Sequence, residues 1–244
     1  MKKITILTLF PEVFENFKKF SIIKRAIANK KLKLTIVNFR QFSKDKHKKV
    51  DDYQFGGGAG MIIGLPAIVA AIKKYKTKNS LVILTSPQGK LFNQAKAKSL
   101  ASSKKDLIIV CGHYEGFDAR LINYVDQVIS MGDYVLTGGE VPAMAMVEAV
   151  TRLVKGVITD SSLDDETFND NLLDYDTFTR PVEYDGHKVP AVLLSGNHKK
   201  INERRCPFAY FNFCYYFIKF HCITSVCYGN ITIRYWNWVC KRII

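Results

Sequence analysis

The sequence lacks the short motifs that mark several common classes of enzyme. No G-x-G-x-x-G follows an apolar run, and neither G-x-x-x-x-G-K-[ST] nor H-E-x-x-H occurs anywhere. These motifs hold a dinucleotide, a nucleoside triphosphate and a catalytic zinc ion, respectively. The usual signals for dinucleotide binding, phosphate transfer and zinc hydrolysis are therefore missing.

Cysteine is present but forms no framework. No C-x-x-C occurs, and the six cysteines match no zinc-ligand spacing. Cys111 stands alone at the end of an apolar run, where a buried small hydrophobic residue is expected. A reducing, cytoplasmic compartment is the expectation. No apolar stretch reaches the ~20 residues that span a bilayer, so no membrane partner is expected.

Acidic residues are few, and the charge is unevenly distributed. The 244 residues contain 36 Lys and Arg against 22 Asp and Glu, a formal net charge of +14. Residues 1–50 carry 14 of the basic residues and three acids, whereas residues 160–176 carry seven acids and no base. Such an excess indicates a polyanionic partner or simply a soluble basic protein. The segregation favours the partner.

Apolar runs and helical segments alternate along the first 155 residues. Strands are expected at residues 2–10, 32–36, 81–85, 107–111 and 125–130. Helices are expected from Pro11, at 21–29, from Pro66, and at 93–102, 118–124 and 140–154. A polar loop fills the stretch before Gly60. This alternation predicts an α/β fold with a mostly parallel sheet and helices on both faces.

Each of the last three expected strands ends in a glycine turn. The turns read S-P-Q-G (residues 86–89), C-G-H-Y-E-G (111–116) and M-G-D-Y-V-L-T-G-G-E (131–140). Glycine lets the backbone approach a ligand closely, and ligands of parallel sheets lie beyond the carboxyl ends of the strands. The turns predict one small-molecule pocket built largely from main chain. The glycine run at 56–60 is a weak signal alone, because a flexible surface loop would look the same.

The composition divides the chain into four parts. Residues 1–156 form the expected ligand-binding domain, 157–177 an acidic interdomain linker, 178–205 the start of a C-terminal domain, and 206–244 an anomalous tail. The tail holds five of the six cysteines, both tryptophans and 12 of the 30 aromatic residues, and no Asp or Glu. A membrane-interacting hairpin, a cysteine-rich metal module and out-of-frame translation compete to explain it. The last is favoured, because neither periodicity nor ligand spacing is sustained.

Eight segments, in order, resemble the bacterial tRNA (guanine-N1)-methyltransferases over residues 1 to about 201. They are L-T-L-F-P-E-V-F (7–14), V-D-D-Y-Q-F-G-G-G-A-G-M (50–61), S-P-Q-G, C-G-H-Y-E-G, S-M-G-D-Y-V-L-T-G-G-E (130–140), L-L-D (172–174), T-R-P (179–181) and L-L-S-G-N-H (193–198). The resemblance implies a homodimer with a deep trefoil knot. It further implies transfer of a methyl group from S-adenosyl-L-methionine to N1 of the guanosine immediately 3′ of the anticodon in tRNA.

The resemblance also assigns roles to residues. It implies cofactor binding by Ser86, Pro87, Gly89, Gly112, Tyr114, Glu115, Ser130, Met131, Gly132, Asp133, Tyr134, Val135, Leu136, Gly138, Gly139 and Pro142. It implies tRNA binding by Gly57, Gly58, Asp174, Ser195, Asn197 and His198. His113 is expected to be a loop residue and not a general base. No tight metal site is visible, although the resemblance implies Mg²⁺ as an activator, with Glu115 as the candidate for an indirect contact.

Two residues are expected to act on the guanine. Glu166 stands where the family has its aspartate base, and Asp165 is the alternative; Arg152 matches the arginine that stabilises the guanine. Without the resemblance, a solvated acidic linker and an arginine favoured by the dipole at a helix C-terminus would be the favoured explanations.

Two other functions remain to be weighed. A noncatalytic or inactive RNA-binding protein that retains the fold is the alternative, because the tail replaces a basic helical segment and disrupts the small C-terminal domain. A nucleotide-binding oxidoreductase is disfavoured by the missing fingerprint. Cofactor binding would separate the oxidoreductase from the other two, and turnover on tRNA would separate those two.

Overall fold

The chain forms two compact units, Met1–Leu163 and Asp164–Ile244. The computed structural model describes residues 1–159, 172–173, 175–204 and 208–209. The division falls inside the segment predicted as an acidic linker. The predicted tail from residue 206 lies outside the described residues except for residues 208–209.

The first unit is built on a five-stranded parallel sheet with the strand order β2-β1-β6-β5-β7. Its strands are β1 (Lys2–Thr8), β2 (Leu32–Asn38), β5 (Ser80–Leu91), β6 (Asp106–Val110) and β7 (Gln127–Ser130). β6 lies between β1 and β5, and β7 lies on the other side of β5. The connection from β6 to the edge strand β7 therefore crosses over β5. The predicted α/β fold with a mostly parallel sheet is confirmed.

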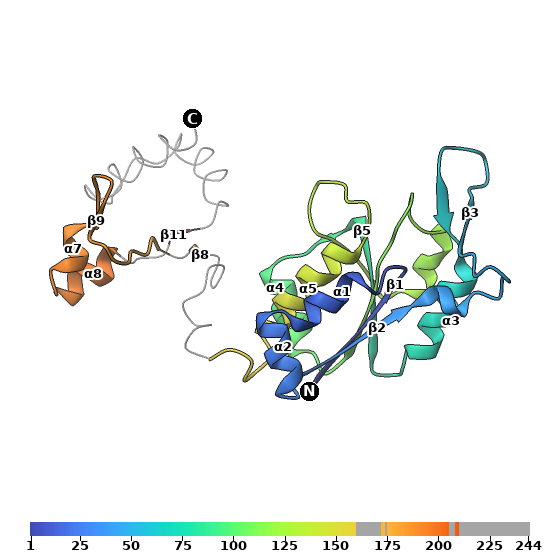
Figure 1. The fold of residues 1–244 in the computed structure, drawn as a ribbon, viewed down its shortest axis with the longest axis horizontal. Coiled ribbons are helices and arrows are strands. Elements are labelled where there is room, and N and C mark those ends of the chain that lie inside the picture. Colours follow the sequence, from blue (N-terminus) through green and yellow to red (C-terminus); the bar gives the residue numbers. More distant parts are fainter. Residues whose placement is uncertain (160–171, 174, 205–207, 210–244) are drawn as a thin grey trace, which may run out of the picture. The chain divides into compact units, whose positions relative to one another are not determined.

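Helices cover both faces of this sheet, as predicted. They are α1 (Val13–Lys19), α2 (Ser21–Ala28), α3 (Leu65–Tyr75), α4 (Gln94–Ser102) and α5 (Glu140–Arg152), with the 3-10 helices η1 (Phe39–Phe42) and η2 (Ala119–Tyr124). Figure 1 shows α1, α2, α4 and α5 on one side of the sheet and α3 on the other. None of the helices within the described ranges is long and apolar enough to cross a membrane.

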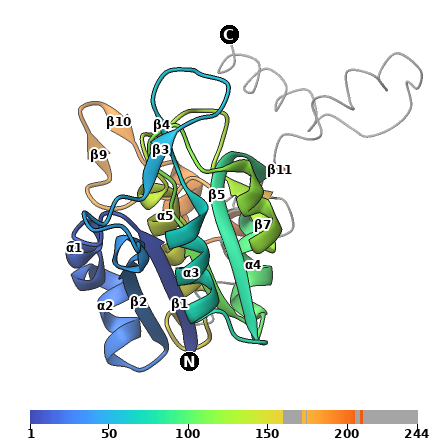
Figure 2. The ribbon, with the colours of Figure 1, turned by 90° about the vertical axis from the view of Figure 1, so that its right-hand side faces the viewer.

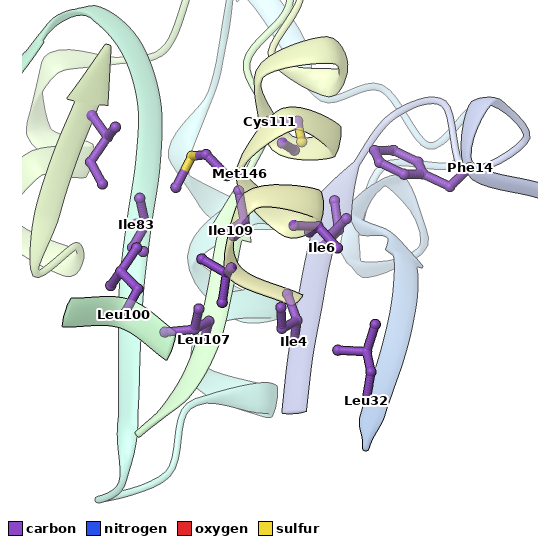
Figure 3. Packing of buried hydrophobic residues seen from close by; sticks show 14 of the residues in the cluster. Ile4, Ile6, Phe14, Leu32, Ile83, Leu100, Leu107, Ile109, Cys111 and Met146 are labelled. Carbon is purple, nitrogen blue, oxygen red and sulfur yellow. The ribbon is translucent and has the colours of Figure 1, made fainter. Parts of the chain in front are cut away.

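Two apolar clusters, one on each face, hold the helices to the sheet. Ile4 and Ile6 of β1 and Ile109 of β6 belong to the cluster under α1, α2, α4 and α5, whereas Ile108 and Val110 of β6 face α3. Figure 3 shows how side chains of the first cluster converge from strands and helices. Successive residues of a strand point to opposite faces, so a central strand buried on both faces reads as a continuous apolar run.

Two segments differ from their predicted structure. Residues 119–124 form a 3-10 helix instead of an α-helix, with the Asp118 side chain accepting from the Arg120 N–H. The predicted polar loop before Gly60 contains η1 and β3 (Asp51–Tyr53), which pairs antiparallel with β4 (Met61–Ile63). Strands of three residues give too short an apolar pattern to detect from sequence.

A buried lysine holds the C-terminus of α4. Lys2 Nζ donates to the carbonyl oxygens of Leu100 (2.6 Å), Ser103 (2.8 Å) and Lys105 (3.0 Å). The last carbonyls of a helix have no partner within the helix, so an ammonium group there satisfies them. Burial lowers the pKa of Lys2, and the nearby carboxylate of Asp106 partly opposes this shift. The contact connects α4 to the start of β1.

The second unit is described in short elements. β9 (Glu183–Tyr184) and β10 (His187–Lys188) form an antiparallel hairpin, and β8 (Leu172–Leu173) pairs with β11 (Phe208–Ala209). Two short helices follow the hairpin, α7 (Ala191–Leu194) and α8 (His198–Arg204).

Asp126 connects the start of β7 to its neighbours. Its carboxylate accepts from the Val82 N–H of β5 (2.7 Å) and from Lys76 Nζ at the end of α3 (3.1 Å). Burial alone would raise the pKa of this carboxyl group, but the hydrogen bonds from Val82 and Lys76 outweigh it, and the pKa lies below its ordinary value. The carboxylate form therefore stabilises the fold.

We expect Asp126→Asn to lower the free energy of unfolding at pH 7 by about 1 kcal/mol, the low end for a hydrogen bond to a charged group that is partly exposed. A lowered folded-state pKa gives stability that is present above the unfolded-state pKa of about 4 and lost as the pH falls through the folded value. Urea unfolding should therefore show a smaller difference at pH 2.5. Glu15→Gln, which breaks the exposed pair with Lys18, is the control and should change little. An equal difference at both pH values would contradict the assignment.

Candidate active site

The first loop of the site is a bulge inside β5. Thr85 and Lys90 of β5 both pair with Ile129 of β7, so residues 86–89 leave the ladder between the strands. The bulge holds the S-P-Q-G motif, and Pro87 and Gln88 are exposed at its tip. The predicted turn is thus an interruption within one long strand.

Gly89 lets the bulge return directly onto β7. A Cβ added there would lie 2.5 Å from the Ile129 nitrogen and 2.6 Å from the Val128 carbonyl carbon. Real Cβ atoms do not approach backbone this closely, so any side chain would push the bulge away from β7. The glycine fixes the position of the first loop.

The second loop follows β6 and is held by the β3–β4 hairpin. The Ile63 N–H donates to the Gly116 oxygen (2.8 Å), and the Glu115 N–H donates to the Met61 oxygen (3.2 Å). The Glu115 side chain lies over Gly60, where an added Cβ would be 2.6 Å from its Cγ. The structure therefore brings the glycine run at 56–60 to the C-G-H-Y-E-G turn.

The third loop leaves β7 and returns to the second. The Ser130 hydroxyl donates to the Gly132 oxygen (3.1 Å) and accepts from the Gly132 N–H (3.2 Å), which starts the loop. Residues 133–137 are exposed. At its far end Gly138 pairs with His113, and the Gly139 N–H donates to the Gly112 oxygen (2.8 Å).

Gly139 lies directly on the ends of β5 and β6. A Cβ added to it would overlap Thr85 Oγ1 and lie 2.8 Å from the Cys111 Cα and the Gly112 nitrogen. The chain turns into α5 immediately afterwards. All three loops thus meet at the carboxyl edge of the sheet, the end at which Figure 2 shows the β3–β4 hairpin.

Comparison with known proteins decides the family of this fold. The family model for tRNA (guanine-1)-methyltransferase TrmD matches residues 1–209. The chain belongs to this methyltransferase family. A tRNA (guanine-N(1)-)-methyltransferase of Malacoplasma penetrans is 56% identical over 203 residues, which cover 83% of this chain and 89% of the relative. The corresponding enzyme of Ureaplasma urealyticum is 55% identical over the same shares, and that of Mycoplasmopsis pulmonis 49% identical over 84% and 90%.

The three loops contain the residues for which membership of the methyltransferase family implies cofactor contacts. Residues 86–89, 112–115 and 130–139 come from different strands and lie at one edge of the sheet. Pro142 is buried in the first turn of α5, next to the same edge. The predicted set is therefore brought together within one unit of one chain.

His113 is packed between aromatic rings in this methyltransferase. Its ring centroid is 4.6 Å from that of Phe10 and 5.0 Å from that of Tyr114. Its Nδ1 is buried and has no hydrogen-bond partner among the described residues. The prediction that it is a loop residue is consistent with this packing.

Cys111 is buried, as predicted, and is a poor nucleophile. Burial raises the pKa of the Cys111 thiol well above its ordinary value, and the nearby carboxylate of Glu140 raises it further. Only the thiolate is strongly reactive, so this cysteine acts as a small apolar residue.

Arg152 lies at the opposite end of α5 from the glycine turns. The helix contains 13 residues and rises 1.5 Å per residue, so the arginine is about 18 Å along the axis from Glu140. One copy of the chain does not bring it to the three loops.

The remaining predicted residues lie elsewhere. Glu166, Asp165 and Asp174 lie outside the described residues. Gly57 and Gly58 are exposed in the first unit. In the second unit, Ser195 donates to the Val192 oxygen and accepts from the Asn197 N–H, Asn197 accepts from the Lys200 N–H, and His198 is exposed at the start of α8.

Two threonines next to the loops were not predicted. Thr85 Oγ1 donates to the Val110 oxygen (3.0 Å), and Thr8 Oγ1 donates to Glu140 Oε1 (2.7 Å). Each is a hydroxyl residue that follows an apolar run, Thr8 at the end of β1 and Thr85 directly before the bulge in β5. This position in the sequence could have marked the two threonines as candidates, but it does not reveal which distant residue each one hydrogen bonds to.

A hollow beside the bulge does not coincide with the loops. Its volume is about 670 Å³, and it is lined by residues 88–91, by α4 and by residues 126–129 along the outer edge of β7. It shares only Gly89 with the predicted set, so we place the site by the loops. No cluster of three or more His, Cys, Asp or Glu suited to a metal occurs within the described ranges.

We expect Gly139→Ala and Gly89→Ala to lower the free energy of unfolding by about 1–3 kcal/mol each, as in other overpacked sites. Gly64→Ala is the matched control, because a Cβ there makes only ordinary contacts at 3.6 Å or more. It should change the free energy by less than about 1 kcal/mol. Urea unfolding of the three variants measures this, and equal stability would show that the close approach is not required.

Proposed function

We propose that this protein transfers a methyl group from S-adenosyl-L-methionine to N1 of the guanosine immediately 3′ of the anticodon in tRNA. The observation that carries the proposal is the family match over residues 1–209, which includes all three loops at the carboxyl edge of the sheet. The relatives are tRNA (guanine-N(1)-)-methyltransferases by name. Nothing in these matches favours the alternative of a noncatalytic RNA-binding protein.

The loops fit the proposed cofactor. Gly89, Gly138 and Gly139 let the loops pack directly against neighbouring protein atoms, where a Cβ would collide, so the loops present closely packed main-chain N–H and C=O groups to an adenosine. Tyr134, Val135 and Leu136 are exposed on the third loop and offer apolar surface for the purine. When bound, S-adenosyl-L-methionine supplies an electrophilic methyl group on its sulfonium.

The residues of the chain must then activate the guanine. N1 of guanine carries a proton and has no free lone pair, so the proton has to be removed as the N1–methyl bond forms and the sulfur–methyl bond breaks. We assign its removal to the Glu166 carboxylate, with Asp165 as the alternative. Arg152 opposes the negative charge that develops on O6.

The position of Arg152 supports a homodimer. Because α5 places it about 18 Å from the glycine turns, a second copy of the chain is the natural source of this arginine for each set of loops. The path of residues 131–139, which cross back over the ends of β5 and β6 after β7, supports the deep trefoil knot of the family.

A basic surface is available for the tRNA. Lys44, Lys46, Lys48 and Lys49 are exposed in one loop, and the Asp45 carboxylate orders this loop by accepting from the His47 and Lys49 N–H groups. Those hydrogen bonds lower the pKa of Asp45, the one from Lys49 most. Lysines contribute to RNA binding through the phosphates. Because the substrate is tRNA, we infer that the enzyme acts in the cytoplasm. Membership of the family also suggests Mg²⁺ as an activator.

We expect the full chain to bind S-adenosyl-L-methionine. A nicotinamide dinucleotide should give no heat of binding. Isothermal calorimetry with each ligand separates the methyltransferase from a nucleotide-binding oxidoreductase. Gly139→Ala should abolish the heat and Gly64→Ala should preserve it. Saturable dinucleotide binding, or no binding of S-adenosyl-L-methionine, would overturn the cofactor assignment.

We expect Glu166→Gln and Arg152→Ala each to reduce methyl transfer to tRNA by ~10²-fold or more, because each removes a group acting on the guanine. Cofactor affinity should change little. Turnover is measured with radiolabelled methyl donor. If the parent is too slow, the parent and both variants are made with the C-terminal segment of the Malacoplasma penetrans relative in place of the residues from 206 onward. Full activity of Glu166→Gln with loss in Asp165→Asn would move the base to Asp165.

A further inference from the structure

A buried acidic residue lies beneath the three loops. Glu140 is 7% exposed, and among the described residues only it and Lys2 are charged and buried. Moving a carboxylate out of water costs several kcal/mol unless hydrogen bonds or charges compensate it. Glu140 is the last residue of the M-G-D-Y-V-L-T-G-G-E motif, yet the proposed chemistry gives it no role.

One of its oxygens is held by Thr8 at the end of β1. Thr8 Oγ1 accepts from the Phe10 N–H (2.9 Å), so its single proton is directed to Glu140 Oε1, 2.7 Å away. The carboxylate also occupies the first position of α5, where the helix dipole favours a negative charge.

The other oxygen faces the glycine turn. A Cβ added to Gly138 would overlap Glu140 Oε2 and would lie 2.9 Å from His113 Nδ1 and 3.3 Å from the Gly112 oxygen. The carboxylate and the imidazole therefore flank the same glycine, and that imidazole nitrogen has no hydrogen-bond partner in the described part of the chain. Gly138 and Gly139 are the residues that join the third loop to the second.

We propose that Glu140 is a positioning residue that sets the Gly138–Gly139 turn of the methyl-donor site and is itself held by Thr8. The inference rests on the proposed function, because it concerns the loops assigned to S-adenosyl-L-methionine. Glu140 acts through the backbone of the turn and not on the reacting atoms. Its loss should therefore weaken donor binding and leave the chemical step at saturating donor nearly unchanged.

The test compares donor affinity in Thr8 and Glu140 variants of the full chain. We expect Thr8→Val and Glu140→Gln each to raise the Kd for S-adenosyl-L-methionine about tenfold, the change that corresponds to loss of roughly one hydrogen bond to a charged group. Thr8→Ser, which keeps the hydroxyl, should bind within twofold of the parent. The double variant should be no weaker than the weaker single variant, because both changes break one interaction.

Two controls separate positioning from general stability. Ile68→Val shortens a fully buried side chain of α3 on the opposite face of the sheet, so it should lower the melting temperature by a few degrees without changing the Kd. Glu148→Gln removes an exposed carboxylate from α5 and should change neither. If Glu140→Gln does not fold, the comparison of Thr8→Val with Thr8→Ser carries the test.

The outcomes distinguish this inference from the proposed function. If the parent, Thr8→Val and Glu140→Gln all bind the donor equally well, the positioning role is overturned and the proposed function is not. Weakening in Ile68→Val in proportion to its lost stability would also overturn it. A parent that does not bind the donor overturns both proposals.

Discussion

The close approach of Gly139 to the ends of β5 and β6 is the constraint on which the site depends. Its backbone occupies the space beside Thr85, Cys111 and Gly112 that a side chain would need. The third loop can therefore return across the sheet and hydrogen bond to the second loop before α5 begins. Gly89 solves the same problem at the bulge in β5, so backbone contacts between strand ends bring all three loops to one edge.

Strand β1 connects helices to both ends of the sheet through buried polar contacts. At its start, Lys2 satisfies the final carbonyls of α4, and at its end Thr8 donates to Glu140 at the start of α5. Buried charges add little net stability, because the cost of desolvation opposes their attraction to a partner. A buried charged group is, however, satisfied by only a few arrangements of its neighbours. Such contacts fix where each helix end meets the sheet, while the apolar clusters on both faces supply most of the stability.

The proposed chemistry is divided between the three loops at the sheet edge and groups from other segments of the chain. The loops to which we assign the methyl donor belong to one sheet edge within the first unit, where packing determines their geometry. The groups assigned to the guanine come from other parts of the sequence: Arg152 from the distant end of α5 and Glu166 from the acidic segment. In the proposed arrangement, the active site is complete only when these segments and a second copy of the chain meet around the RNA.

The sequence by itself determined the α/β class, the parallel strands and the glycine turns at their ends, because apolar periodicity and turn residues are local properties. Its motifs also indicated the family, which the matches confirm. Only the tertiary structure decided that the S-P-Q-G motif is a bulge within β5, that β3 and β4 hold the second loop, and that Thr8 meets Glu140. Those features arise from contacts between residues as far apart as 132 positions, which no local pattern records.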